Sequence, residues 1–219
     1  MIMGQSNEKY LIRIDRFEQL ELANIIIEYS IPNIYNIHSG KKYTNLFSKM
    51  VYISPTLINY ESTKFIDINR DINVLTTFIN INEPRRKSLI NNLSDLNINY
   101  KNINTCFKIE ELEKLYNNTK ILINIHQTEH HHTFEELRVL PALLSGVIVI
   151  SEVSPLNNLI PYNDFIIWCS YDNIVEMTMK VINNYDYYFN KIFESTNILS
   201  ILHENNIQKF ENKILDTKI

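Results

Sequence analysis

Hydrophobic and polar residues follow one another along the chain in blocks that predict strands separated by amphipathic helices. The clearest block runs from residue 120 to residue 152. Its residues 121–125 form a short apolar run with β-branched side chains, which is typical of a strand buried on both faces. A polar loop comes next, and apolar residues then recur at helical spacing as far as Gly146, where a helix-ending glycine is expected. Residues 147–150 are a second buried strand, so the block predicts a strand, a helix and a parallel strand.

The same alternation extends over the rest of the chain from residue 72 onward. Pro84 is a plausible first residue of a helix, and Asp172 is a plausible helix cap. Further strands are expected at residues 73–79, 98–100 and 165–169, and further helices at residues 85–96 and 109–116 and after residue 172. Strands that alternate with helices in this way predict an α/β fold with a doubly wound, mostly parallel sheet.

The first part of the chain is less regular. Strands are expected at residues 24–29 and 50–53, whereas residues 61–71 are polar and irregular and suit a linker. The sequence therefore predicts a short N-terminal α/β segment, residues 1–71, followed by a larger domain, residues 72–219.

Composition narrows the class of protein. With 219 residues, of which 45% are hydrophobic and 21% charged, the chain has enough apolar material for a core. The formal net charge of -4 gives no indication of a nucleic-acid partner. The N-terminus lacks an apolar signal core and no apolar run approaches ~18 residues, so we expect no transmembrane segment and a soluble, cytoplasmic protein. Cys106 and Cys169 lack metal-site spacing and are expected to be reduced, buried thiols.

The central helix supplies the first candidate site residues. Thr133 and Glu136 have the spacing of a capping box, so the helix is expected to begin at Phe134 and to turn Leu137 and Leu140 inward. In open α/β sheets ligands bind beyond the carboxyl ends of the strands, which is where this helix begins. Its unpaired N–H groups and dipole suit a diphosphate, whereas the alternative, which the capping pattern favours, is an ordinary structural capping box of Thr133 and Glu136.

Three arginines are candidate anion ligands. Arg138 lies one turn into the central helix, where its planar fork suits a phosphate or, alternatively, a salt bridge to a nearby glutamate. Arg85 and Arg86 open another helix at a strand's carboxyl end, and cations there oppose the helix dipole. A bound diphosphate would stabilise them, whereas the alternative is a solvated basic turn. Because consecutive helical residues point in different directions, only one of the two can face a ligand.

Four of the six histidines lie in the loop at residues 126–132. Adjacent histidines in a loop seldom converge on one point, and no zinc motif accompanies them, so no metal site is expected. His126 follows the strand directly and is the candidate general base, with a structural histidine as the alternative. His132 is a candidate hydrogen-bonding residue for a sugar.

The region from residue 72 resembles the nucleotide-sugar-binding half of GT-B glycosyltransferases, of the kind called group 1. The resemblance rests on Arg138, on Ala142 and Leu143 ahead of Gly146, and on the apolar strand after it. It implies a Rossmann-like domain that binds a nucleoside diphosphate sugar. It also implies transfer of the sugar to an acceptor hydroxyl without a cofactor or metal.

Two departures separate the chain from that family. The family carries a pair of glutamates on the central helix, and here the second position is Pro141 while the first falls at Thr133. The ribose contact of the second glutamate is therefore missing, and a proline inside the helix is expected to kink it. The acceptor-binding half is also shortened, to roughly the first 70 residues.

Three functions remain open at this level. The first is a glycosyltransferase whose partners are a nucleotide sugar and an acceptor of unknown kind, glycan or protein. The second is a non-catalytic nucleotide-sugar-binding module that works with a partner chain or as a homo-oligomer. The third is a structural α/β interaction domain, because a fold alone does not determine activity.

Overall fold

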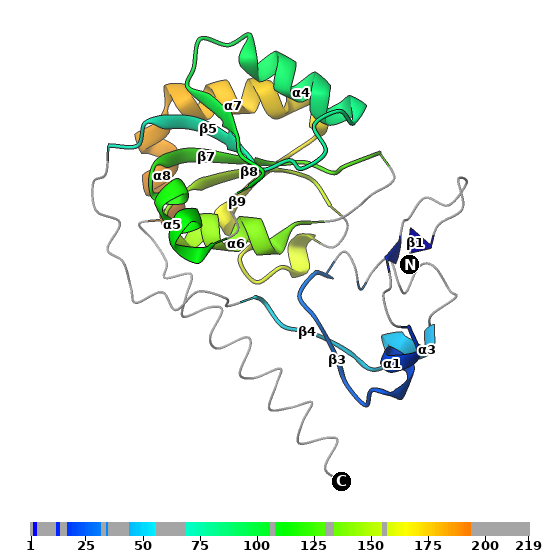
Figure 1. Cartoon of the computed structure of the whole chain (residues 1–219). Helices are drawn as coiled ribbons and strands as arrows, with labels where there is room; N and C mark the ends of the chain where they lie inside the picture. The colour runs from blue at the N-terminus through cyan, green and yellow to red at the C-terminus, as the bar shows by residue number, and fades with distance from the viewer. Residues whose placement is uncertain are drawn as a thin grey trace.

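A five-stranded parallel sheet forms the centre of the molecule in the computed structural model (Figure 1). The structure describes residues 2–3, 12–13, 17–31, 34, 44–55, 69–105, 108–129, 134–154 and 157–193. The strands lie in the order β6-β5-β7-β8-β9, and every pair is parallel. Their bounds are β5, Ile72–Thr76; β6, Tyr100–Asn102; β7, Thr119–Asn124; β8, Ile148–Glu152; and β9, Ile166–Cys169. The α/β fold with a parallel sheet is confirmed, and it is Rossmann-like in its alternation of strands and helices.

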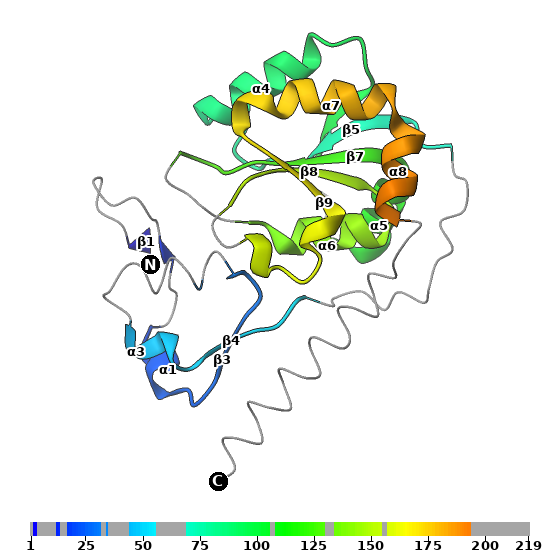
Figure 2. The same cartoon turned by 180° about the vertical axis from the view of Figure 1, so that it is seen from behind.

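Helices cover both faces of this sheet. Figure 1 shows α4 and α7 on one face and α5 and α6 on the other, and the reverse view in Figure 2 agrees. Helix α8 follows α7 and lies toward the amino ends of the strands, where Lys120 of β7 lies 5.5 Å from the centre of the Tyr185 ring. The helices are α4, Pro84–Ser94; α5, Ile109–Asn117; α6, Glu136–Leu144; α7, Ile174–Asn183; and α8, Tyr185–Phe193. Among the described residues, the 3-10 turns η1, Asn157–Leu159, and η2, Asn163–Phe165, lie between β8 and β9, and η3, Tyr171–Asn173, leads from β9 into α7. None of the described helices is long and apolar enough to cross a membrane.

The central strands are buried because layers of helices exclude water from both of their faces. Val74, Ile121 and Ile148 are fully buried and lie side by side on β5, β7 and β8 through the sheet register. The apolar runs in the sequence therefore predicted these strands correctly. The shorter edge strand β6 begins at Tyr100, later than the expected residues 98–100.

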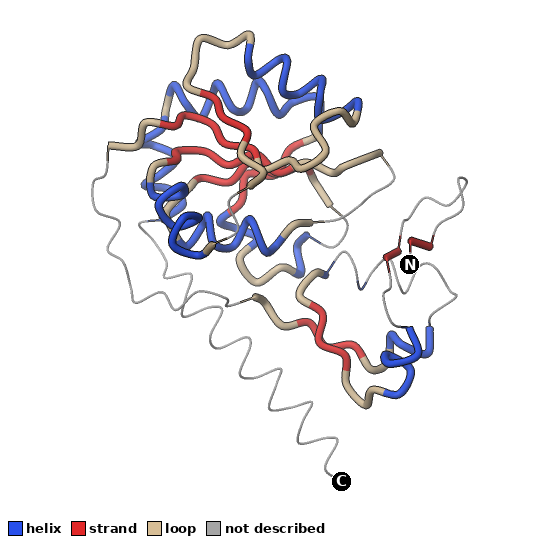
Figure 3. Tube along the Cα trace, in the orientation of Figure 1, coloured by secondary structure: helices blue, strands red, loops and turns tan. Residues whose placement is uncertain are grey.

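The N-terminal part contributes two short pairs of strands. Strands β1, Ile2–Met3, and β2, Ile12–Arg13, are antiparallel, while β3, Ile26–Glu28, and β4, Met50–Tyr52, are parallel. Two short helices accompany them, α1, Phe17–Leu22, and α3, Thr44–Phe47. Ile26 and Leu46 form a small separate core. The tube in Figure 3 shows β3 and β4 beside each other, outside the main sheet. Both expected strands are confirmed, whereas most of the expected linker, residues 61–68, lies outside the described residues.

Helix α6 differs from its expected form at its first turn. It begins at Glu136, not at Phe134, and its N-cap is Glu135, which makes no side-chain capping bond. The Glu136 carboxylate is used elsewhere, so the capping-box interpretation is wrong for this residue, and Thr133 lies outside the described residues. Leu137 is 36% exposed, because α6 buries the side that carries Val139, Leu140 and Leu143.

The end of α6 agrees with the sequence. Gly146 has a positive φ of 70°, which a glycine adopts without strain. The N–H of Val147 bonds to the carbonyl of Ala142, and the N–H of Gly146 bonds to that of Leu143. This pattern is a Schellman motif, which turns the chain directly into β8. Pro141 lies inside the helix and is buried, and the kink expected from it stays a prediction.

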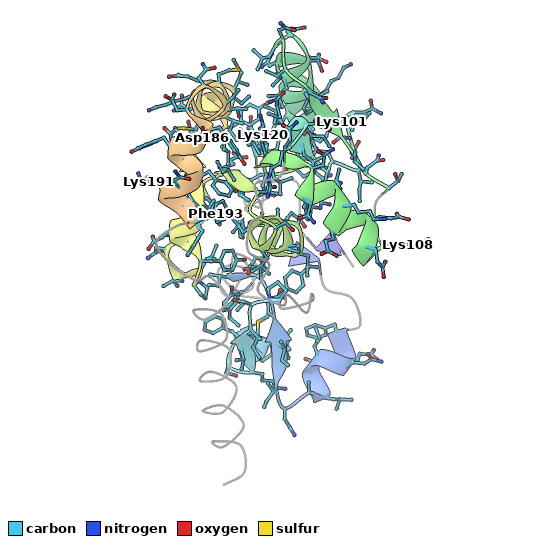
Figure 4. All side chains as sticks on the ribbon, turned by 90° about the vertical axis from the view of Figure 1, so that its left-hand side faces the viewer. Lys101, Lys108, Lys120, Asp186, Lys191 and Phe193 are labelled. Atoms are coloured by element: carbon cyan, nitrogen blue, oxygen red, sulfur yellow. The ribbon has the colours of Figure 1, made fainter. Side chains whose placement is uncertain are left out.

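At the amino ends of the strands, one buried arginine joins several segments. Arg70 donates to the carbonyls of Tyr116 (3.0 Å), Thr119 (2.6 Å) and Ser145 (2.7 Å). It therefore ties the segment before β5 to the ends of α5 and α6. Figure 4 views the molecule from this side, with Lys120 and Asp186 labelled.

Candidate functional site

The strand order places a switch point between β5 and β7. The chain leaves β5 into α4 on one face of the sheet and leaves β7 into α6 on the other (Figure 1). In open α/β sheets a crevice forms beyond the carboxyl ends of two such strands, and ligands bind there. Arg85 and Arg86 follow β5, and His126 follows β7. The sequence-predicted candidates that the structure describes therefore gather at one edge of the sheet.

Arg85 is held by partners within the protein. Its Nη2 lies 2.6 Å from Glu152 Oε1 at the end of β8, and both side chains are largely buried. Its Nη1 donates to the carbonyls of His126 (3.3 Å) and Thr128 (3.4 Å). The guanidinium carbon lies 4.3 Å from the centre of the Tyr171 ring, whose hydroxyl donates to the Arg85 carbonyl. Arg85 thus joins the segments after β7 and β9 to the end of β8, and Glu152 balances its charge without a ligand.

Arg86 differs from its neighbour. Its side chain is 6% exposed, and its guanidinium carbon lies 4.8 Å from the centre of the Phe78 ring. Among the described residues, its Nε has no hydrogen-bond partner. Burial lowers the pKa of Arg86, and the nearby positive charge of Arg138 lowers it further, against the opposing effects of Glu135 and Glu83. Arg86 and Arg138 are thus near enough for their like charges to interact, and Glu135 and Glu83 oppose this effect.

Electrostatic repulsion between two arginines is relieved by an anion placed between them. The two helices that carry Arg86 and Arg138 also direct the positive ends of their dipoles toward this edge. The side chain of Glu83 accepts a bond from the Arg85 N–H and so caps α4, after which Pro84 is the first helical residue, as the sequence predicted. The arrangement suits a phosphate or carboxylate group chemically.

His126 lies beneath this edge and is 3% exposed. Its backbone N–H donates to Glu152 Oε2 (2.9 Å), and its Nδ1 lies 3.5 Å from Glu152 Oε1. His132 and its two histidine neighbours lie outside the described residues. Within the described part of the chain, no three His, Cys, Asp or Glu side chains come together to hold a metal ion.

Sequence reasoning missed Glu152, although a signal was available. A carboxylate that directly follows a buried apolar strand at the ligand edge of a parallel sheet needs a partner. Here the partners are Arg85 and His126. The free thiol of Cys169 lies near by, where burial and the Glu152 charge raise its pKa to about 11, so it stays protonated.

Glu136 is the most deeply buried carboxyl group of the edge. Its Oε2 accepts from the hydroxyls of Tyr162 (2.6 Å) and Tyr52 (2.8 Å), and Tyr52 also bonds to Ser54. Burial raises the pKa of Glu136 to about 7, against the opposing effect of the two tyrosine hydroxyls and of the Ile31 N–H. Because Tyr52 belongs to β4, this group connects the N-terminal segment to the first turn of α6.

Phe134 packs at the same junction between the N-terminal segment and α6. It is not the first residue of the helix, as the sequence had suggested. Its side chain is 2% exposed and packs on Trp168, with ring centres 5.1 Å apart. Its carbonyl accepts a bond from the Ser30 hydroxyl (3.4 Å) of the N-terminal segment. The structure therefore gives Phe134 a packing role at the base of the loop.

The chain is similar to two uncharacterized proteins of Acanthamoeba polyphaga mimivirus. The first is 27% identical over 230 residues, which cover 98% of this chain and 77% of the relative. The second is 26% identical over 172 residues, which cover 78% of this chain and 55% of the relative. No model of a known protein family matches the chain.

Proposed function

We propose that this chain is a glycosyltransferase of the GT-B type that takes its sugar from a nucleoside diphosphate sugar. The observation that supports it best is the like-charged pair Arg86 and Arg138 at the switch point of the sheet. A buried arginine with an unused Nε costs folding free energy, and a bound diphosphate offsets that cost. The resemblance of the chain to the donor-binding half of that family is the reason for proposing a nucleoside diphosphate sugar as the donor.

In the proposed reaction the acceptor oxygen forms a bond to the anomeric carbon while the bond from that carbon to the diphosphate oxygen breaks. Negative charge grows on the departing diphosphate, and Arg86, Arg138 and the first turn of α6 stabilise it. No metal ion or cofactor takes part, and the nucleoside diphosphate sugar is the donor substrate.

The proton of the acceptor hydroxyl passes to His126 in this proposal. His126 lies two residues after the end of β7, at the switch point beside the two arginines' helices. Its ring is shielded from bulk water, which disfavours hydrolysis of the donor. The histidine loop, with His132 and Thr133, supplies hydrogen bonds to the sugar.

Two observations favour the alternative of a binding module without catalysis. Pro141 occupies the position where the family has a glutamate, and it is buried inside α6, so no side chain contacts the ribose from there. His126 is also too buried to meet an acceptor unless the residues around it rearrange. In that case a partner chain or a second copy of this chain supplies the acceptor side.

Calorimetric titration of nucleoside diphosphates tests the anion site. Arg138→Ala and Arg86→Ala should each weaken binding by about tenfold or more, because each removes a charge-assisted hydrogen bond. The matched control is Lys87→Ala, since Lys87 is the exposed neighbour of Arg86 on the same helix turn. The uncharged nucleoside should respond much less to either arginine substitution.

If the wild type and both arginine variants bind nucleoside diphosphate equally well, these two residues do not belong to the binding site and their role is structural. Release of nucleoside diphosphate from the donor sugar then separates the two functions. Slow hydrolysis by the wild type, lost in His126→Ala with binding intact, supports the transferase, because a general base acts in the transition state. Binding without any turnover supports the module.

A further inference from the structure

Glu152 contacts His126 at two places, which distinguishes this pair from a chance neighbour contact. Oε2 accepts the backbone N–H of His126 at 2.9 Å, and Oε1 lies 3.5 Å from the ring Nδ1. The first contact fixes the start of the loop after β7, and the second fixes which ring nitrogen faces the carboxylate. Both groups are largely buried, so water competes weakly for either contact.

Glu152 is itself held in place. Arg85 Nη2 lies 2.6 Å from the same Oε1, and Arg85 stacks on Tyr171. The guanidinium of Arg85 donates to this oxygen, so Glu152 Oε1 serves as a hydrogen-bond acceptor. The ring nitrogen that faces an acceptor oxygen is the one favoured to carry a hydrogen.

We propose that Glu152 is a positioning residue that holds the neutral His126 ring with its hydrogen on Nδ1. The opposite nitrogen, Nε2, is then the atom with the lone pair. This inference rests on the proposed function only in its last step, where Nε2 takes the proton of the acceptor hydroxyl while Nδ1–H stays against Glu152. Arg85 acts one step further back, by holding the carboxylate.

Long-range nitrogen–proton NMR correlation on the full ¹⁵N-labelled chain reads the tautomer of each histidine directly. The His126 signals are identified by their absence in His126→Gln. We expect a protonated Nδ1 and an unprotonated Nε2 in the wild type at a pH where the ring is neutral. In Glu152→Ala the hydrogen should move mainly to Nε2, and in Glu176→Ala, an exposed glutamate of α7, the spectrum of His126 should not change.

Glu152→Gln provides a second variant of nearly native size in case Glu152→Ala does not fold. Its neutral amide loses most of the attraction to Arg85, and it can also turn its N–H₂ group toward Nδ1. It should therefore lower the fraction of the Nδ1–H form. A wild type with the hydrogen on Nε2, or the same tautomer in the wild type and in the folded Glu152 variant, would overturn the proposal.

Kinetics separate this inference from the proposed function. If the chain transfers sugar, Glu152→Ala should lower kcat by about tenfold or more and leave KM nearly unchanged, because proton transfer belongs to the transition state. If the wild type has the expected tautomer but transfers no sugar, Glu152 positions His126 and the chain is not a transferase. If the wild type transfers sugar but the Glu152 variants keep the same tautomer, the chain is a transferase and Glu152 does not position His126.

Discussion

The amino and carboxyl edges of the parallel sheet each contain a buried arginine, and the two side chains are satisfied differently. At the amino edge, Arg70 donates to three main-chain carbonyls of the protein. At the carboxyl edge, Arg86 packs on Phe78, and its Nε has no partner among the residues that the structure describes. Burial lowers the pKa of both arginines, so both are costly to bury. We propose from this difference that Arg70 serves the fold, whereas Arg86 serves a bound group that the fold does not supply.

Arg85 resembles Arg86 in its position and Arg70 in having partners within the protein. It lies at the carboxyl edge beside Arg86, yet Glu152 and two carbonyls occupy its guanidinium. Position at the ligand edge is therefore not enough to indicate binding. The partners of the side chain decide between a structural and a binding role.

The largest expected effect is at the amino edge. Arg70→Ala should lower the free energy of unfolding by roughly 4 kcal/mol, because three buried hydrogen bonds to main-chain carbonyls are lost together. Urea denaturation measures this change, and Lys101→Ala on the exposed side of β6 is the matched control, with an expected change within about 0.5 kcal/mol. A loss below about 1 kcal/mol for Arg70→Ala would show that Arg70 contributes little to the stability of the fold, which would contradict the comparison with Arg86.

Arg85→Ala should lower the free energy of unfolding by roughly 3 kcal/mol. The substitution leaves Glu152 buried without its cation, which is more costly than losing the pair together. The double substitution Arg85→Met with Glu152→Met should therefore be less destabilised than Arg85→Ala. The same urea titration measures both proteins, and equal losses would show that the ion pair is not the reason.

Glu136 should make stability depend on pH near neutrality. Its folded-state pKa of about 7 lies above the unfolded value of 4.5, so the folded protein holds this proton more tightly. The stabilisation is complete below about pH 4.5 and is lost as the pH rises through about 7, by roughly 3 kcal/mol in all. Glu136→Gln cannot lose a proton and should lack this slope, while Glu135→Gln should retain it. Unfolding free energies at pH 5, 6, 7 and 8 measure the effect, and identical slopes in all three proteins would contradict it.

The smallest expected change in stability is at Arg86. Arg86→Met keeps the packing on Phe78 and removes a buried charge, so the free energy of unfolding should change by less than about 1 kcal/mol or should rise. Binding of nucleoside diphosphate should nevertheless weaken, in contrast to Arg70→Met, where stability should fall. If Arg86→Met destabilises the chain as much as Arg70→Met, the two edges do not differ as we propose.

Local sequence signals predicted the parts of the fold that depend on nearby residues. The apolar run of β7, Pro84 at the start of α4 and Gly146 at the end of α6 each depend on neighbours within a few positions. The α/β alternation follows from the same signals, and so does the gathering of the arginines and His126 at one edge of the sheet.

Contacts between distant residues were not predictable in this way. Glu136 reads as a capping residue in its own helix, but Tyr52, 84 residues earlier, binds its carboxylate. Asp172 likewise reads as the cap of α7, but Asn173 is the N-cap and makes no side-chain capping bond. The choice between Arg85 and Arg86 depends on Glu152, which lies on a strand 67 residues away. Spacing along the chain contains no information about such partners.

The bond between Tyr52 and Glu136 also has a consequence for the order in which the chain acquires its structure. A ribosome releases β3 and β4 well before it has added Glu136 and Tyr162, so the N-terminal segment waits for its anchor during synthesis. Consecutive strands of the main sheet, by contrast, are joined by one α-helix or by short 3-10 turns and close over shorter stretches of chain. We therefore expect the main sheet to form first and the N-terminal segment to dock last, as a late step of maturation.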